Sequence, residues 1–366
     1  MPSPDSPIVA VSQRVERFLQ EQRETAEILG AEARSFVEAG AAAASGGKRF
    51  RARFCLAGWD ATATASDASL IEIPDAVIAA AAALEVFHAA ALVHDDIIDN
   101  SDTRRGAPAA HRAFEASHRA AAWAGDADAF GRSAAVLLGD LLVAWSDDLF
   151  ESGLLAHADP AVAAAARHEY ARMRREVTIG QFLDVAEESA HVVVPDAEHA
   201  ERALRIASLK SGRYSVQHPL LLGAVLAGAD AAQYEALSAF GHPVGLAFQL
   251  RDDVLGVFGD SAVTGKPVGD DLREGKRTLI VAYTRERLEP EALRVFDELL
   301  GDPELTAEQV AFLQQTMRDT GALRRVEELI NGWVEEADRA LDGARLGDAA
   351  VSGLRELARA ATARAS

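Results

Sequence analysis

Two aspartate-rich segments, each at the end of an apolar helical stretch, restrict what this chain can fold into. The first is HDDIID at residues 94–99, where Asp95 and Asp99 are four residues apart and therefore share one helix face. The second is FQLRDD at residues 248–253. Neighbouring carboxylates repel, and an apolar helix disfavours them unless a hard divalent cation with oxygen ligands compensates. A single pair fits a solvated acidic helix end, but two such clusters predict magnesium bridging a diphosphate.

The pattern of apolar residues predicts an all-α protein. Alanine is abundant, β-branched residues are scattered, and no segment shows the alternation of a half-buried strand. Turn signals divide the chain into helical pieces without a long flexible linker, so we expect one helical domain over residues 1–366. We expect residues 1–10 to be a disordered lead-in and the glycine-rich residues 257–276 to be a mobile loop over a ligand site.

The charge balance narrows the classes of partner and location. The chain has 37 Lys and Arg against 57 Asp and Glu, a formal net charge of −20, which disfavours binding to nucleic acid or an anionic membrane. The single Cys55 excludes an internal disulfide and fits a reducing cytoplasm. The longest apolar run, Val77–Val93, contains Glu85 and His88, so we predict a buried core helix and no membrane span.

Basic residues matter locally, in two places. The segment GGKRFR at residues 46–51 has glycines that let the backbone approach a ligand, followed by Lys48 and by the guanidinium of Arg49 or Arg51. That combination suits a diphosphate, although it also describes an ordinary solvated turn. The second place is Arg104-Arg105, which follows the first aspartate cluster within about two helical turns.

Six ordered segments together resemble the trans-isoprenyl diphosphate synthases, the family that includes farnesyl and geranylgeranyl diphosphate synthases. The resemblance implies an all-α bundle around a deep central cavity, with the two aspartate motifs facing each other across its mouth. The segments span most of the chain: GGKRFR at 46–51, HDDIIDNSDTRRG at 94–106, GQFLD at 180–184, LKSG at 209–212, FQLRDD at 248–253 and GKPVGDDLREGKRT at 265–278.

The resemblance also implies a magnesium site and a reaction. Asp95 and Asp99 would coordinate two magnesium ions, and Asp96 would support that site. Asp252 would hold a third ion. The ions and nearby cations would stabilise the departing diphosphate of an allylic substrate, so that its C–O bond ionises without a protein nucleophile. The double bond of isopentenyl diphosphate would then attack the allylic cation, and a proton would be lost.

The remaining matched residues are implied to bind the two substrates. Ser211 and Gln249 would direct oxygen dipoles at the allylic cation, and Gln181 and Asp184 would lie near the metal. The cations implied to contact the allylic diphosphate are Arg104, Lys210, Lys266 and Lys276. The residues implied to form the isopentenyl diphosphate pocket are Gly47, Lys48, Arg51, His88 and Arg105, with Phe248 beside the hydrocarbon.

One departure from the family pattern concerns the second motif. In the family an acid usually follows the Asp252-Asp253 pair about one turn later, but this chain has Gly256 at that position. Asp260 lies one turn beyond and is a candidate replacement, with water as the alternative. Metal binding by this motif is therefore the weaker of the two expectations.

Small side chains before the first motif bear on product length. Residues 91 and 87 share the helix face of Asp95 and lead away from it. In the family, bulky residues at the positions of Ala90 and Ala91 stop the product at farnesyl or, in some members, geranylgeranyl length. Here both are alanine, and Phe87, about 5 Å deeper, is the next candidate floor. We expect geranylgeranyl diphosphate, with farnesyl or a longer prenyl product as alternatives; the allylic primer, whether dimethylallyl, geranyl or farnesyl diphosphate, stays open.

Two other classes of function share part of this pattern. A class I terpene cyclase has a similar first metal motif but a different second one, and it needs no isopentenyl diphosphate pocket. Lys48, Arg51 and the Asp252-Asp253 pair therefore argue against a cyclase. A non-catalytic subunit of a prenyl synthase is disfavoured by the intact acids and cations. We expect a cytoplasmic protein and, on the family resemblance, a homodimer with its interface around residues 109–150.

Overall fold

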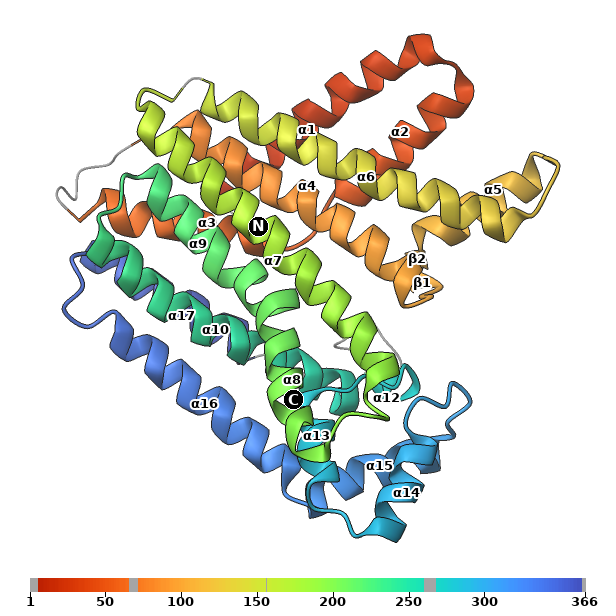
Figure 1. Ribbon diagram of the computed structural model, residues 1–366. Coiled ribbons are helices and arrows are strands. Elements are labelled where there is room, and N and C mark those ends of the chain that lie inside the picture. Colours follow the sequence, from red (N-terminus) through yellow and green to blue (C-terminus); the bar gives the residue numbers. More distant parts are fainter. Residues whose placement is uncertain (1–5, 66–71, 156, 260–267, 364–366) are drawn as a thin grey trace. The chain divides into compact units, whose positions relative to one another are not determined.

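The computed structural model describes residues 6–65, 72–155, 157–259 and 268–363, and it confirms the all-α prediction (Figure 1). The chain divides into two compact units. The residues of the first fall within 1–63, 67–166 and 222–228, and those of the second within 64–66, 167–221 and 229–366. The expectation of one domain, with two motifs facing each other across a cavity, stays a prediction.

The first unit is built on a central apolar helix. Its elements are α1 (Pro7–Ala26), the 3₁₀ turn η1 (Glu27–Leu29), α2 (Ala31–Ala44), α3 (Phe50–Ala63), α4 (Asp75–Ile98), β1 (Thr103–Arg104), β2 (Ala107–Pro108), α5 (Ala110–Ala120) and α6 (Ala127–Leu154), with the start of α7 (Pro160–Ala190) and the end of α9 (His218–Leu226).

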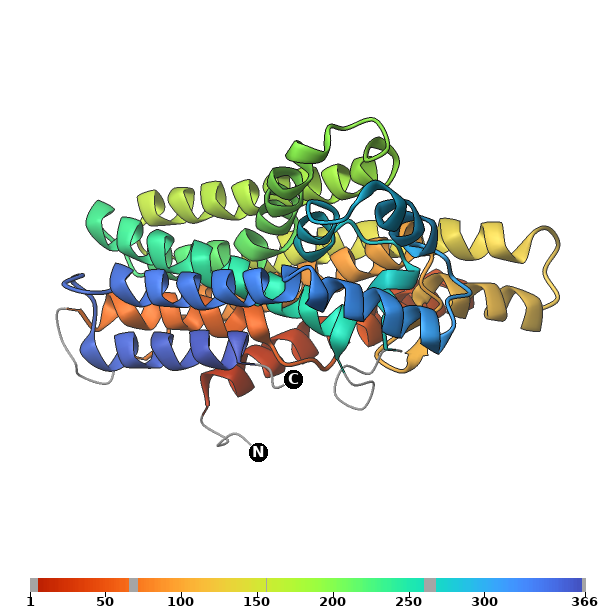
Figure 2. The ribbon, with the colours of Figure 1, turned by 90° about the horizontal axis from the view of Figure 1, so that it is seen from below.

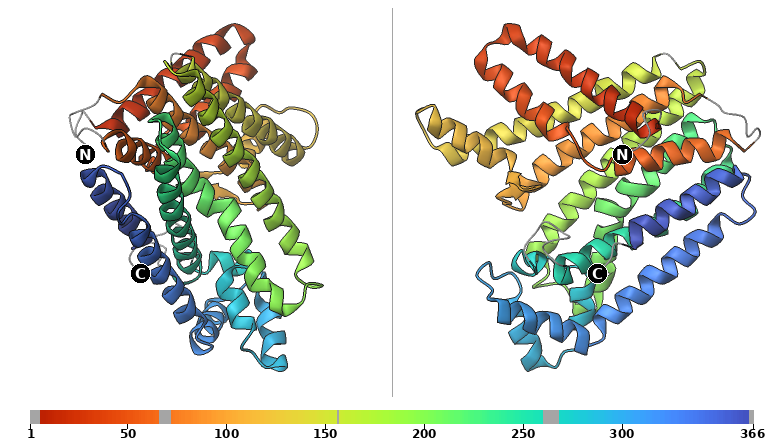
Figure 3. Two further views of the ribbon diagram at one scale, coloured as in Figure 1. Left: turned by 60° about the vertical axis from the view of Figure 1, so that its left-hand side comes forward. Right: turned by 180° about the vertical axis from the view of Figure 1, so that it is seen from behind.

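Helix α4 is apolar on every side and is the core of this unit. Helices α1, α3 and α6 pack against it, and α1 and α2 form a hairpin that Figure 3 shows in red. Glycines on α6 allow the close approach of α6 and α4, because a Cβ at Gly153 would lie 2.5 Å from the Cβ of Ala79. Helix α4 is long and apolar enough to cross a membrane, but 78% of its most apolar stretch is buried, as in a core helix.

The second unit is built on α10. Its elements are most of α7 (Pro160–Ala190), η2 (Asp196–Glu198), α8 (His199–Ile206), the π-helix η3 (Ala207–Gln217), the start of α9 (His218–Leu226), α10 (Ala231–Phe258), α12 (Asp270–Arg273), α13 (Leu279–Arg285), α14 (Pro290–Leu299), α15 (Ala307–Asp319), α16 (Ala322–Ala340) and α17 (Asp348–Thr362).

The elements η3, α12, α13, α16 and α17 pack around α10, and polar contacts hold α16 and α17. The guanidinium of Arg251 donates to both carboxylate oxygens of Glu327 on α16 at 2.6 Å, and its Nε donates to the carbonyl of Thr362 in α17 at 3.0 Å. Helices α16 and α17 lie side by side in Figure 2. The backbones of η3 and α10 come close at Gly212 and Gly245, since a Cβ at Gly245 would lie 2.2 Å from the Gly212 carbonyl oxygen.

Three local expectations need correction. Helix α1 begins at Pro7, inside the segment expected to be a disordered lead-in, because Val11 and Val15 bury its apolar face. Helix α10 continues to Phe258 and α12 forms within the segment expected to be a loop; residues 260–267 lie outside the described part of the chain. Residues 103–108 form a two-stranded hairpin, which the helical prediction missed. The proposed mobility of residues 257–276 stays a prediction.

A partly buried ion cluster joins α7, η3 and α9 in the second unit. The Glu176 carboxylate accepts hydrogen bonds from Arg172 Nε at 2.8 Å and Arg213 Nη1 at 3.0 Å. It also pairs with His218 Nε2 at 3.1 Å, and His218 Nδ1 lies 2.6 Å from Glu169 Oε1. Burial raises the pKa of Glu176, but these donors outweigh burial and lower the pKa to about 2. Glu176 therefore stabilises the fold as an anion.

We expect Glu176→Gln to reduce the loss of stability in acid. Because the folded pKa is below the ordinary value of 4.5, the stabilisation is present above pH 4.5 and is lost as the pH falls toward about 2. The melting temperature of the wild type should therefore fall more steeply between these pH values than that of the variant. Glu336→Gln, at an exposed position of α16, is the control and should follow the wild type. Parallel curves for Glu176→Gln and wild type would contradict this assignment.

Candidate functional site

The first acidic motif lies at the C-terminal end of α4. Asp95 and Asp96 are in its last turn, and Asp99 caps it through the backbone hydrogen bond from Asp99 N to Asp95 O, 2.8 Å. Arg104 of the hairpin binds these acids: its Nε donates to Asp96 Oδ1 at 2.8 Å, its Nη2 also contacts Asp96, and its Nη2 lies 3.8 Å from Asp95 Oδ2. Burial raises the pKa of Asp96, which is 3% exposed, and the hydrogen bond from Arg104 opposes that shift. Asp96 thus holds Arg104 beside the Asp95 carboxylate.

The turn of the hairpin explains how Arg104 reaches the acids. Strand β1 pairs antiparallel with β2, and the two residues between them, Arg105 and Gly106, have φ of 53° and 77°. Positive φ at both central residues is what a tight type I′ hairpin requires. The chain therefore reverses directly after Arg104 and leaves both arginines near the end of α4.

The basic loop before α3 is brought to the same place. Gly46, Gly47 and Arg49 have positive φ, and a Cβ at Gly47 would lie 3.4 Å from Arg105 Nη2. The glycine-rich loop and the arginine after the first motif are therefore neighbours, as the resemblance implied. Lys48 is exposed in this loop, and Arg51 is buried.

His88 of α4 lies among the same cations. Burial lowers the pKa of its imidazole well below the ordinary value of 6.5. The positive charges of Arg51 and Arg105 lower the pKa further, and Arg104 adds to the effect. His88 is therefore neutral at pH 7 and sits beside cations from two separate segments of the sequence.

Glu85 was not singled out as a site residue, and it organises the loop. Its Oε1 accepts a hydrogen bond from the backbone N–H of Ala52 at 3.0 Å, and its Oε2 lies 3.9 Å from Arg49 Nη1. Arg49 also donates to the carbonyl of Ala44 at 3.3 Å. The sequence left open whether Arg49 or Arg51 would contact a diphosphate. The contacts of Arg49 make it a buried structural residue. A buried glutamate interrupting an apolar helix was the signal available in the sequence.

The residues expected to set product length lie on α4 as predicted, but one of them, Ala90, is fully buried. Ala91 is partly exposed and Phe87 is buried, and both lie on the face of Asp95. Ala90 is fully buried, so a larger side chain at residue 90 would change the packing around α4.

The second unit brings the GQFLD and LKSG segments together. A Cβ at Gly180 would lie 2.3 Å from the backbone nitrogen of Lys210, so α7 and η3 cross here. Lys210 Nζ donates to Asp184 Oδ2 at 2.5 Å. The buried Nε2 of Gln181 has no hydrogen-bond partner in the part of the chain that is described. Lys210 and Ser211 lie in the π-helix η3, a rare conformation that recurs at functional sites.

The second acidic motif lies in the last turns of α10. Gln249 Nε2 donates to Asp253 Oδ1 at 2.6 Å, while Asp252 is exposed. Burial raises the pKa of Asp253 to about 8, and the negative charges of Asp271 and Asp252 add to the shift. Phe248 is partly buried one residue before Gln249. Several acids are therefore crowded at this end of α10.

Asp271 of α12 is one of the acids close to Asp253, although the sequence pattern did not single it out. Lys276 Nζ lies 3.5 Å from Asp271 Oδ1 and 2.7 Å from Glu274 Oε2. Lys276 thus lies close to Asp271 and Glu274, and its expected contact with the allylic diphosphate stays a prediction. Asp260 and Lys266 lie outside the described residues, so their expected roles stay predictions.

Neither acidic group forms a complete metal cage from side chains alone. Among the described residues, no three His, Cys, Asp or Glu are close enough to hold a metal ion by themselves. Magnesium is usually bound by one or two carboxylates together with water and substrate phosphates. The pair Asp95 and Asp99, with cations beside it, is a donor set of that kind.

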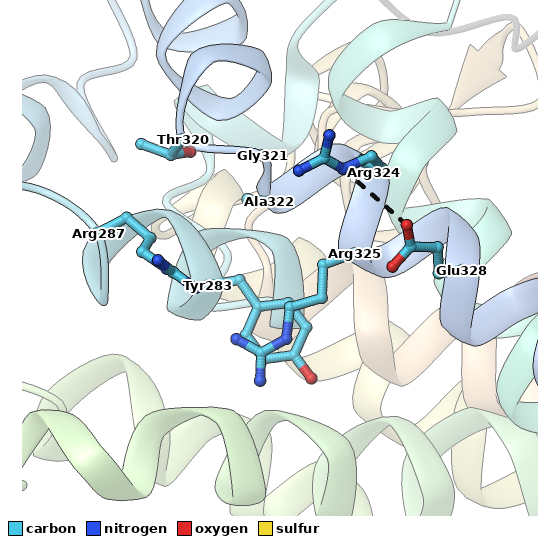
Figure 4. A pocket seen from close by; sticks show the side chains of 8 residues that line it. All are labelled: Tyr283, Arg287, Thr320, Gly321, Ala322, Arg324, Arg325 and Glu328. Carbon is cyan, nitrogen blue, oxygen red and sulfur yellow. Dashed lines mark ion pairs between the residues drawn. The ribbon is translucent and has the colours of Figure 1, made fainter.

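A separate hollow of about 400 Å³ lies in the second unit, lined by residues of α13 and by the start of α16 (Figure 4). Arg325 stacks on Tyr283 at 3.4 Å from the ring centre and pairs with Glu286 at 2.7 Å. Arg324 lies 3.9 Å from Glu328 and is largely exposed. Two of the arginines that line this hollow form ion pairs with carboxylates. We therefore interpret the hollow as part of a surface cluster of ion pairs.

Comparison with known proteins identifies a family and relatives that match most of the chain. The sequence profile of the polyprenyl synthetase family matches residues 35–317. The short chain isoprenyl diphosphate synthase of Methanocaldococcus jannaschii is 33% identical over 64% of this chain and 63% of that protein. The geranylfarnesyl diphosphate synthase of Aeropyrum pernix is 31% identical over 80% of this chain and 82% of that protein.

A solved structure is similar over almost the whole chain. It is the geranylgeranyl pyrophosphate synthase from Corynebacterium glutamicum, complexed with isoprenyl diphosphate and magnesium. It is 40% identical, covers 98% of each chain and superposes with a TM-score of 0.89.

Proposed function

Because this chain belongs to the polyprenyl synthetase family and is a prenyltransferase, we propose that it condenses isopentenyl diphosphate with an allylic diphosphate to give geranylgeranyl diphosphate. The observation that carries the proposal is the arrangement at the end of α4. There a carboxylate pair, Asp95 and Asp99, lies beside cations from the loop at 46–51 and from the hairpin at 103–108. Carboxylates for a metal beside cations for phosphate are what a diphosphate substrate needs.

The acidic residues fit magnesium, and we propose three ions per active site. Asp95 and Asp99 would hold two, and Asp252 a third. When bound, the metal supplies positive charge that stabilises the departing diphosphate. Asp96 keeps Arg104 beside Asp95, so Arg104 is placed to contact diphosphate oxygens without a large movement.

The cluster around His88 suits isopentenyl diphosphate. Arg51 and Arg105 offer paired N–H donors, the backbone at Gly47 allows close approach, and exposed Lys48 adds a mobile charge. The lowered pKa of His88 keeps its imidazole neutral, so His88 acts as a hydrogen-bonding group and not as a further cation. This division limits the repulsion among the arginines before the anion binds.

The second unit is proposed to serve the allylic substrate. Lys210 is held by Asp184, and the N–H donor of Gln181 is available to an oxygen of the diphosphate. The hydroxyl of Ser211 and the amide oxygen of Gln249 would face the allylic cation, with Phe248 near the isopentenyl chain. Lys266 and Lys276 are proposed to complete the diphosphate site.

Product analysis tests the proposed function. Purified protein is incubated with isopentenyl diphosphate and, separately, with dimethylallyl, geranyl or farnesyl diphosphate, and the products are separated by chromatography. We expect geranylgeranyl diphosphate as the main product, loss of activity after chelation and recovery with magnesium. Turnover that is undiminished without a divalent metal would refute the mechanism. Farnesyl or longer products would correct the chain length and leave the reaction class intact.

We further propose that the protein is a cytoplasmic homodimer, with its interface in residues 109–150. Val136 and Leu137 of α6 expose apolar side chains, Leu137 by 60%, and the α5–α6 hairpin also exposes Trp123. Exposed apolar groups close together favour contact with another copy.

We expect Leu137→Glu to lower the sedimentation coefficient from that of a dimer toward that of a monomer. Leu29→Glu, at a residue that is 63% exposed outside this segment, is the matched control and should stay dimeric. A monomeric wild type at micromolar concentration would contradict the proposal.

A further inference from the structure

The π-helix η3 carries two residues of the proposed allylic site, Lys210 and Ser211, and it is longer than a usual π-helical segment. Most π-helical turns are single bulges within α-helices. In contrast, η3 runs over the 11 residues of Ala207–Gln217. The backbone hydrogen bonds of a π-helix join residues i and i+5. Accordingly, the N–H of His218 at the end of η3 donates to the carbonyl of Arg213. Residues five positions apart are therefore neighbours along η3.

The side chains of Ser208 and Arg213 use this spacing to form a bridge across one π turn. Arg213 Nε donates a hydrogen bond to Ser208 Oγ at 3.2 Å. In an α-helix, residues five positions apart point about 140° away from each other, and pairs three or four apart are the ones that meet. The bridge therefore belongs to the π conformation and would open if this turn became α-helical. Lys210 and Ser211 lie between its two ends.

Both ends of the bridge are anchored on neighbouring helices. Arg213 Nη1 donates to Glu176 Oε2 on α7 at 3.0 Å, and Ser208 Oγ lies 2.9 Å from Nε2 of His242 on α10. These residues all belong to the second unit and are partly buried. The planar guanidinium of Arg213 reaches two acceptors at once, which the single ammonium of a lysine does not reproduce. A chain of polar contacts thus runs from α7 through the π turn to α10.

We propose that Arg213 is a positioning residue for the allylic substrate, because its bridge to Ser208 maintains the π turn that presents Lys210 and Ser211. The inference rests on the proposed function, in which Lys210 contacts the allylic diphosphate and the Ser211 hydroxyl faces the allylic cation. Arg213 acts through the backbone of η3 and touches neither substrate. A turn that relaxed to an α-helix would be narrower, so the two side chains that it carries would change direction.

The first test compares the two substrates in steady-state kinetics. We expect Arg213→Lys to lower kcat/KM for geranyl diphosphate by about 100-fold, the scale of a misplacement of about 1 Å. The KM for isopentenyl diphosphate should stay nearly unchanged, because its proposed pocket lies in the first unit. Lysine keeps a positive charge beside Glu176, so the melting temperature should stay close to that of the wild type.

The matched control is Arg205→Lys, the same substitution at an exposed ion pair of α8, which should leave both kinetic parameters and the melting temperature unchanged. Wild-type kinetics in Arg213→Lys would overturn the inference. Equal losses for the two substrates together with a lower melting temperature would also overturn it, because a general loss of stability would then explain the result.

The second test starts from the other end of the bridge and holds even if Arg213→Lys folds poorly. Ser208→Ala removes the acceptor but leaves the ion pair of Arg213 with Glu176, so we expect the same selective loss for geranyl diphosphate. Ser208→Thr keeps a hydroxyl and should retain wild-type kinetics. Because both changes break one bridge, the double variant Arg213→Lys/Ser208→Ala should lose no more than either single variant. Equal losses in Ser208→Thr and Ser208→Ala, or additive losses in the double variant, would overturn the inference.

The outcomes separate this inference from the proposed function. If the wild type forms prenyl diphosphate and both Arg213→Lys and Ser208→Ala do so equally well, only the role of Arg213 is wrong. If the wild type forms no prenyl diphosphate from isopentenyl diphosphate and any allylic diphosphate, the proposed function itself is wrong.

Discussion

Asp95→Asn is expected to lower the turnover number by about a thousandfold or more, because it removes charge that holds the metal and stabilises the departing diphosphate. Asparagine keeps the size of the side chain and its place in the last turn of α4. Binding of the hydrocarbon parts of the substrates does not involve this carboxylate, so KM should change less than kcat. Steady-state kinetics at saturating magnesium measures both parameters.

The matched control is Asp75→Asn, at the opposite end of the same helix. This residue is exposed in the first turn of α4, where an acid interacts favourably with the helix dipole. Its loss should lower stability by about 0.3–1 kcal/mol and leave turnover unchanged. If both variants lose activity equally, a general effect on α4 explains the result, and the assignment of Asp95 fails.

A change of product length is the second large effect. Ala91→Phe places an aromatic ring on the helix face of Asp95, one turn nearer the acids than Phe87, and should shorten the main product to farnesyl or geranyl diphosphate. Phe87→Ala should act in the opposite direction and give products longer than geranylgeranyl. Because the carboxylates stay, product identity should change more than the rate of the first condensation. Chromatography of the products from each variant gives the answer.

The burial of each residue decides whether its variant tests product length alone or stability as well. Ala90 is fully buried, so Ala90→Phe overpacks the core at a cost of about 1–3 kcal/mol and tests stability as much as length. Phe87 is also buried, and Phe87→Ala is expected to cost about 3–5 kcal/mol, so its melting temperature must be measured as well. Ala91→Ser changes volume little and should keep the wild-type product. An unchanged product in both Ala91→Phe and Phe87→Ala would show that this face of α4 does not set the length.

Sequence reasoning succeeded where the geometry is local. The face shared by Asp95 and Asp99 follows from helical periodicity, and the apolar run before them forms the buried helix that it predicts. The close approach of the loop at Gly47 to Arg105 was implied only through the family resemblance. A turn signal at residues 105–108 is present in the sequence, but the pairing of strands around it was not predicted, because Arg105 adopts a positive φ that nothing in an arginine predicts.

Contacts between segments distant along the chain were decided by the tertiary structure. The choice between Arg49 and Arg51 depends on Glu85 of another helix, to which the loop is tied. The place of Asp271 beside Gly256 depends on how α12 packs near the end of α10. Periodicity relates residues a few positions apart, whereas such pairs depend on how helices pack, which the spacing of residues does not specify. The amino-acid pattern therefore determined the helices and the acids on their faces and indicated the family, and only the packed structure decided which acid meets which cation.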